Sequence, residues 1–170
     1  MRRRDLLIAA GVLAAPLSAP AAASPGAPDL VIFDARYDAA RRFAQALAAR
    51  GAATVEAQAD VARLWYGPLR LHRAGGGRIR IAGLTTWADF AVIQSCAREA
   101  RLRPRHVVFH DRSGRSHRVA RGSPDLKARL EDAGRGWPES LAATLGGLDR
   151  PSPPASGSPR LGALVSWVLA

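Results

Sequence analysis

The fold is decided by residues 30–51, which read LVIFDARYDAARRFAQALAARG. The first four residues form an unbroken apolar run, which is typical of a strand buried on both faces of a sheet. From Tyr37 to Arg50 the apolar residues recur at helical spacing, and Gly51 is a favourable residue for ending that helix. A buried strand followed by an amphipathic helix is the repeating unit of an α/β protein.

The same alternation continues as far as Pro104. The sequence predicts a short strand over 53–57, a helix capped by Asp60, a strand over 78–82 and a helix over 87–103. This order predicts an α/β fold, a three-layer sandwich with a mainly parallel sheet and a Rossmann-like or flavodoxin-like topology. In such folds, ligands bind at the carboxyl ends of the strands.

A hairpin is predicted after Pro104. Two runs with strand character, 106–110 and 116–120, flank the turn sequence RSGR. A hairpin pairs its strands antiparallel, so the predicted sheet is mixed and has this hairpin at one edge.

The remaining residues complete one domain and its tail. The α/β domain is assigned to 24–150 and ends in two short helices, one starting near 123–125 and one over 138–145. Residues 151–160 are predicted to be a Pro/Ser-rich loop. Residues 161–170 are predicted to be a last strand that closes onto the sheet of the same domain.

The N-terminal residues have the pattern of an export signal. The chain begins MRRRDLL, continues with apolar residues to Leu17 and then with small residues, which predicts a signal peptide over 1–23. The pair Arg3-Arg4 ahead of Asp5 and two leucines resembles a twin-arginine (Tat) translocation signal, with an ordinary Sec signal as the alternative. The resemblance implies the Tat translocon as a partner during export and a periplasmic or secreted location.

The charge balance is strongly basic. Lys and Arg total 25 against 14 Asp and Glu, a net charge of +11, and losing residues 1–23 would leave +9. Because Lys127 is the only lysine, part of this excess reflects the arginine bias of a GC-rich genome. For an exported protein, nucleic acid is not expected as a partner, and a small anionic molecule or an acidic protein is favoured. Residues 161–170 are too few to span a membrane as a helix, so no transmembrane helix is expected in the mature chain.

A candidate anion site lies where the predicted third strand meets the next helix. Thr85 and Thr86 precede a helix N-terminus, whose free N–H groups and dipole attract anions, and Arg36 follows the first strand. Trp65 and Tyr66 are predicted to form an aromatic wall beside this site. The alternative is a well-capped helix, which uses the same residues.

A catalytic interpretation rests on Asp34, His110 and Asp111. Together with Thr85, the two aspartates resemble the strand-end pattern of the haloacid dehalogenase-like phosphatases. However, Arg36 stands where that family has its second aspartate, and no lysine lies near. Response-regulator receivers have a similar opening but need an aspartate at a strand end where this chain has Gly-Leu. A small hydrolase or transferase with these three residues as acid–base groups stays as an alternative.

The histidines do not match a metal-binding motif. His106 and His110 lie four residues apart on a strand, so their side chains are expected to emerge roughly 13 Å apart. His110, Asp111 and His117 could meet across the hairpin, but the chain has no H-E-x-x-H or cysteine-containing spacing. No metal or cofactor is assigned, and the single cysteine, Cys96, is interpreted as a small buried hydrophobe.

An arginine-rich stretch covers residues 98–121, with eight arginines against Glu99 and Asp111. It is interpreted as a docking surface for an acidic partner or anionic lipid, with a solvated surface as the alternative. Taken together, the sequence favours an exported, non-enzymatic binding or accessory module that holds a small anionic ligand at the strand ends. The hydrolase and the docking protein are the two alternatives.

Overall fold

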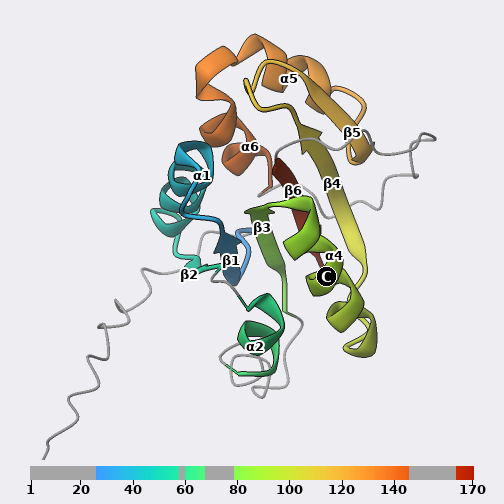
Figure 1. Ribbon diagram of the computed structural model, residues 1–170. Coiled ribbons are helices and arrows are strands. Elements are labelled where there is room, and N and C mark those ends of the chain that lie inside the picture. Colours follow the sequence, from blue (N-terminus) through green and yellow to red (C-terminus); the bar gives the residue numbers. More distant parts are fainter. Residues whose placement is uncertain (1–25, 58–59, 68–78, 146–163) are drawn as a thin grey trace, which may run out of the picture.

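A computed structural model describes residues 26–57, 60–67, 79–145 and 164–170, and it has the predicted alternation of strands and helices (Figure 1). The predicted signal peptide, 1–23, and the predicted loop, 151–160, lie outside the described residues. The elements in chain order are β1 (Leu30–Phe33), α1 (Asp38–Ala48), β2 (Ala53–Glu56), α2 (Val61–Tyr66), β3 (Ile81–Thr85), α4 (Trp87–Glu99), β4 (Pro104–His110), β5 (His117–Arg121), α5 (Leu126–Asp132), the 3-10 turn η1 (Gly134–Gly136), α6 (Trp137–Leu145) and β6 (Leu164–Leu169).

The protein is a mixed α/β protein with a six-stranded sheet among the described residues, in the order β2-β1-β3-β6-β4-β5. Strand β1 pairs parallel with β2 and β3, whereas the β3–β6, β6–β4 and β4–β5 pairings are antiparallel. The prediction of a mainly parallel sheet is therefore wrong. Strands β3 and β4 do point in the same direction, but β6 lies between them and runs opposite to both.

The C-terminal strand β6 is central in this sheet. All six of its residues are buried, as expected for a strand with neighbours on both sides and helices over both faces. Trp167 lies opposite Gly83 of β3, and a Cβ built on Gly83 would come within 2.1 Å of the indole ring. The glycine therefore makes room for the largest side chain of the core.

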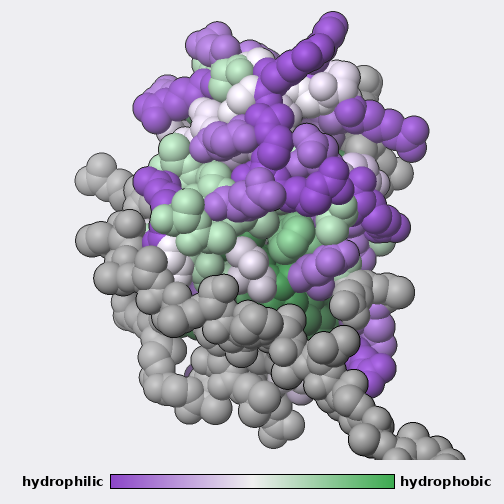
Figure 2. Space-filling view, turned by 90° about the vertical axis from the view of Figure 1, so that its left-hand side faces the viewer, coloured by the Kyte–Doolittle hydropathy of each residue, from purple (hydrophilic) through white to green (hydrophobic). Residues whose placement is uncertain are grey.

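Helices cover both faces of the sheet. On one face, α1, α5 and α6 pack over Val31, Leu84, Val108 and Val168. On the other face, α2 and α4 pack over Ile32, Ile81, Val107 and Trp167. The strands divide their side chains between the two faces by simple alternation. Figure 2, which looks at the α1 side of the molecule, shows hydrophilic side chains over its upper part and apolar ones below them.

The hairpin and the helix boundaries differ from the predictions only in detail. The hairpin is confirmed, with His110 of β4 opposite His117 of β5 and an irregularity between Val107 and Val108. Strand β3 lies later than predicted, over Ile81–Thr85. Helix α4 stops at Glu99 rather than near residue 103, because Arg101 adopts a left-handed conformation with φ of 60°.

Candidate functional site

The residue pair at the end of β1 is a salt bridge. The Asp34 side chain is 1% exposed and accepts hydrogen bonds from the backbone N–H of Arg36 at 3.0 Å and from its Nε and Nη2 at 2.9 and 2.6 Å. Burial by itself would raise the pKa of Asp34, but the hydrogen bonds and the charge of Arg36 outweigh it and lower that pKa. Asp34 is therefore ionised at neutral pH and holds the exposed guanidinium of Arg36 in place.

The two threonines at the end of β3 are engaged in local hydrogen bonds. The Thr86 hydroxyl caps α4 by accepting the Asp89 N–H at 3.2 Å, and it lies 2.6 Å from a carboxylate oxygen of the same Asp89. Thr85 is buried and accepts the indole N–H of Trp167 at 3.0 Å. The structure thus places Arg36 and Thr86 each against a carboxylate. The contacts between Thr86 and Asp89 are those of a capped helix, and the anion site stays a prediction.

Of the two aromatic residues predicted to wall this site, one is buried in the core and the other lies at the far end of α4. Trp65 is buried in the α2–α4 core, and the Tyr66 hydroxyl donates to a carboxylate oxygen of Glu99 at 3.0 Å, a bond that raises the pKa of Tyr66 to about 12. Glu99 ends α4 and Thr86 precedes its first residue. Glu99 is thirteen positions after Thr86 in the chain, which is about 20 Å along the helix axis. The structure does not bring Tyr66 to the strand-end site, because α2 packs beside the far end of α4.

The three candidate catalytic residues make separate sets of contacts. Asp34 is bound by Arg36, as described above. Asp111 organises the hairpin turn by accepting the Ser113 hydroxyl at 2.8 Å and the backbone N–H of Arg115 at 2.9 Å. His110 points into the face covered by α6. Among the described residues, no hydrogen bond joins any two of Asp34, His110 and Asp111.

His110 belongs instead to a buried cluster with His106, His117 and Ser166. The Ser166 Oγ lies 3.1 Å from His106 Nε2 and 2.9 Å from His110 Nε2, and His110 Nδ1 lies 2.8 Å from His117 Nδ1. The prediction that the two side chains stay roughly 13 Å apart is therefore wrong, because the Nε2 atoms of His106 and His110 both reach the same Ser166 oxygen. The two side chains are on the same face of β4, and they lean toward one serine on the neighbouring strand.

Trp137, the first residue of α6, closes this cluster. Its ring stacks on His110 with a centroid distance of 4.2 Å and an interplanar angle of 19°, and it also contacts His117. Gly114 in the hairpin turn has a φ of 65°, and a Cβ there would lie 2.5 Å from the Trp137 indole nitrogen. The turn therefore needs glycine both for its backbone and for the indole beside it.

Burial keeps the three histidines neutral. Desolvation lowers the pKa of His106 to about 3 and the pKa of His117 below its ordinary value. The pKa of His110 is well below its ordinary value because it is buried and because His117 and His106 are beside it. Two of the ring nitrogens, His106 Nδ1 and His117 Nε2, are buried and accept or donate no hydrogen bond within the described structure. In the same residues, no group of three or more His, Cys, Asp or Glu side chains is arranged to hold a metal ion.

Sequence reasoning missed Ser166 and Trp137 as members of this cluster. Both come from segments far along the chain from His106 and His110, so no local spacing connects them. A signal was present in the alternation of His106, Val108 and His110, because three residues at period two share one face of a strand.

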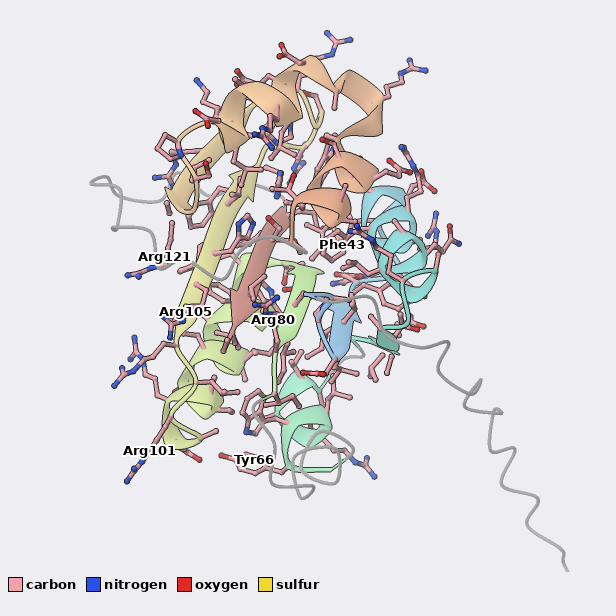
Figure 3. All side chains as sticks on the ribbon, turned by 180° about the vertical axis from the view of Figure 1, so that it is seen from behind. Phe43, Tyr66, Arg80, Arg101, Arg105 and Arg121 are labelled. Carbon is pink, nitrogen blue, oxygen red and sulfur yellow. The ribbon has the colours of Figure 1, made fainter. Side chains whose placement is uncertain are left out.

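The arginine-rich stretch forms an edge of the molecule. In Figure 3, Arg121 and Arg105 lie one below the other on the β5–β4 side of the sheet, and Arg101 lies below both, in the loop between α4 and β4. In the part of the chain that the structure describes, none of these three forms an ion pair with a carboxylate. We call these three residues the arginine edge. Next to it, the Arg118 guanidinium lies 4.5 Å from the centre of the Phe109 ring.

No protein-family model, curated protein or solved structure matches this chain. Within the described residues, every helix is too short or too polar to cross a membrane.

Proposed function

We propose that the protein is an exported accessory module that docks an acidic protein segment along its arginine edge. The observation that carries the proposal is that Arg101, Arg105 and Arg121 line one edge without carboxylate partners in the described structure. Guanidinium groups pair with carboxylates through two parallel hydrogen bonds, so a row of them suits a chain of acidic side chains.

The shape of the edge favours an extended peptide. The register of β5 along β4 ends where Arg121 lies opposite Val107, so Pro104–His106 have a described strand partner only on the β6 side. A strand edge of this kind can accept an extended chain, and the arginines would then select for acidic side chains.

A protein partner accounts for this surface better than a membrane. Surfaces that lie on membranes combine basic residues with exposed apolar or aromatic ones. Among the described residues, the exposed large apolar side chains are Tyr66 and Val92. Val92 belongs to α4 and Tyr66 to α2, and neither belongs to β4 or β5, which carry Arg105 and Arg121. Tyr66 is a single aromatic side chain at the Arg101 end, where its hydroxyl is bonded to Glu99.

The non-enzymatic part of the proposal is supported by the separation of Asp34, His110 and Asp111. General acid–base catalysis requires such groups to lie within hydrogen-bond reach of one reacting molecule. A small anionic ligand near Arg36 is the less favoured function, because it would have to compete with the carboxylates of Asp34 and Asp89.

Export and the likeness to doubly wound folds remain parts of the proposal. Export, through the Tat or another route and to a periplasmic or secreted location, is supported by the pattern of residues 1–23. A flavodoxin-like topology is supported for one half of the sheet only, because β2, β1 and β3 are parallel and adjacent in that order.

The proposal is tested by binding of a synthetic hexaglutamate peptide at low salt. We expect the triple variant Arg101→Gln/Arg105→Gln/Arg121→Gln to weaken binding about tenfold or more, because ion pairs of the exposed Arg101 and of the half-buried Arg105 and Arg121 are lost. The matched control, Arg41→Gln/Arg63→Gln/Arg135→Gln, removes the same charge from exposed positions elsewhere and should change binding little. Equal weakening by both triples would show a non-specific charge effect and overturn the proposal.

A second arm separates the protein partner from a lipid surface. Vesicles of phosphatidylglycerol replace the peptide in a sedimentation assay with the same three proteins. Binding to vesicles that depends on the arginine edge, together with no binding to the peptide, would overturn the acidic-protein proposal in favour of a membrane. Binding to the peptide alone would support it.

A further inference from the structure

The cluster of His106, His110, His117 and Ser166 has more N–H and O–H hydrogens than it has hydrogen bonds to place them in. Each neutral imidazole carries one N–H and the serine carries one O–H, so four hydrogens are available. Three contacts join the four groups, and each contact takes one hydrogen. In the neutral state one of the four hydrogens already has no acceptor inside the cluster. The cluster therefore has no free acceptor for a further hydrogen.

A further proton has no favourable place in this cluster. It would add both a charge and a fifth hydrogen at a site where His106 and His110 are 0% exposed and His117 is 1% exposed. Unpaired charge in a buried site is strongly unfavourable.

The surrounding elements offer little compensation, and the one backbone group that favours the charged form of His117 belongs to Gly114 of the hairpin turn. The carboxylates that act on His117 are Glu131 of α5 and Asp111 of the hairpin turn. Glu131 lies 3.7 Å from Lys127, and Asp111 is used by the turn itself. Strand β6 and helix α6 contribute the uncharged Ser166 and Trp137, and Arg118 of β5 lies on the opposite face, over Phe109.

The cluster lies where helices α5 and α6 pack on one face of the sheet. Its residues come from β4, β5 and β6, and Trp137 at the start of α6 stacks directly on His110. Helices α5 and α6 pack on each other and on this face through Leu126, Leu130 and Leu141. Among the described residues, the buried histidines are His106, His110 and His117, and none of them lies in the core of the opposite face with Ile32, Phe90 and Trp167.

We infer that the histidine cluster is an acid-sensitive latch, which holds α5 and α6 on the sheet at neutral pH and releases them in acid before the α4 side opens. Protonation is favoured in the open state, where the imidazoles reach water. The protein therefore has a second, acid-favoured conformation in which the sheet face under α5 and α6 is accessible.

Amide hydrogen exchange measured by mass spectrometry tests this inference on the whole chain. Labelling times are scaled to the intrinsic exchange rate at pH 7.5, 6.0 and 5.0. We expect exchange over 126–145 to accelerate relative to 87–99 by about thirtyfold at pH 5.0 if one histidine with an ordinary open-state pKa drives the opening. Unchanged exchange, or equal acceleration in both segments, would overturn the latch.

A non-titrating variant is the matched control. Glutamine places an amide nitrogen near the position of imidazole Nε2, and asparagine places one near Nδ1. The variant His106→Gln/His110→Gln/His117→Asn should therefore keep the two contacts with Ser166, lose the contact between positions 110 and 117, and lose the acid response of 126–145. An acid response that persists in this variant would overturn the latch.

A second measurement decides the matter if that variant does not fold. Titration of the histidine ring signals by NMR in the wild-type protein should show three imidazoles that remain neutral until the 126–145 amides lose protection. Three imidazoles that titrate near pH 6.5 while those amides stay protected would contradict the inference. Neither result depends on the arginine edge, so this proposal and the docking proposal stand or fall separately.

Discussion

The two faces of the sheet bury their side chains in different ways. The face under α2 and α4 is filled by apolar groups such as Phe90, Ile93 and Trp167. The face under α1, α5 and α6 has a similar apolar core but also encloses three histidines and Ser166 near its β4–β5 end. The apolar face owes its stability to shape and area, which do not depend on pH, whereas the other face depends on the protonation of its imidazoles. The following predictions separate these two contributions.

The largest expected effect is that of pH on the histidine face. The folded-state pKa values of His106, His110 and His117 lie below the ordinary value, so the unfolded chain binds more protons below about pH 6.5. Stability is complete above that pH and is lost as the pH falls. Between pH 6.5 and 5.0, a histidine that stays neutral in the folded protein, as His106 does with its pKa of about 3, should cost about 2 kcal/mol. The lowered pKa values of His110 and His117 add to this loss in the same direction. Urea denaturation at a series of pH values measures this, and a flat profile over that range would contradict it.

The next largest effect is expected from Gly83→Val, which breaks the apolar face. A Cβ at Gly83 would lie between 2.1 and 2.7 Å from three ring atoms of Trp167, so the indole and its neighbours must move. We expect a loss of about 3 kcal/mol or more in the free energy of unfolding, independent of pH. Gly136→Ala is the control, since a Cβ there meets nothing within 4 Å. Equal midpoints in urea for the two variants would show that the close approach is not restrictive.

Ser166→Ala should have a smaller effect, on the histidine face alone. The substitution removes the oxygen shared by His106 and His110 and leaves two ring nitrogens without their partner. A cost of about 2 kcal/mol is expected at pH 7.5. Ser95→Ala, at an exposed position of α4, should be neutral in the same denaturation experiment. A neutral Ser166→Ala would mean that the serine does not hold the two imidazoles.

The smallest effect is expected from Asp34→Ala, directly after the end of β1. It removes the carboxylate that accepts from the backbone N–H, Nε and Nη2 of Arg36, and because that guanidinium can turn to water we expect a loss of about 1 kcal/mol at pH 7. The lowered pKa of Asp34 sets the sign of the pH dependence. Its contribution is present above the ordinary aspartate value and is lost as the pH falls through the lower folded value. Urea denaturation at pH 7 in low and in high salt measures this cost, and a cost that salt leaves unchanged would show that the contacts are not ionic.

Much of the secondary structure was predictable because it depends on neighbours in the chain. The apolar run of β1, the periodicity of α1 and the capping threonine of α4 are local patterns, and the structure contains all three. The candidate sites were less predictable. Thr86 and Asp34 were predicted as site residues from their positions at strand ends. In the structure, Thr86 is hydrogen-bonded to the Asp89 carboxylate and Asp34 to the Arg36 guanidinium. Tyr66 was placed beside Thr86 because nothing in the sequence shows where α2 packs.

The sequence by itself determined that this is an α/β protein with a hairpin after Pro104, because side-chain periodicity and turn residues act over a few positions. Only the tertiary structure decided that β6 lies between β3 and β4 and that Ser166 joins His106 to His110. The physical reason is the same for both. Strand pairing and burial bring together residues separated by about a third of the chain, and any apolar strand with hydrogen-bonding edges can fill the central position. Which strand does so depends on how all the side chains pack at once.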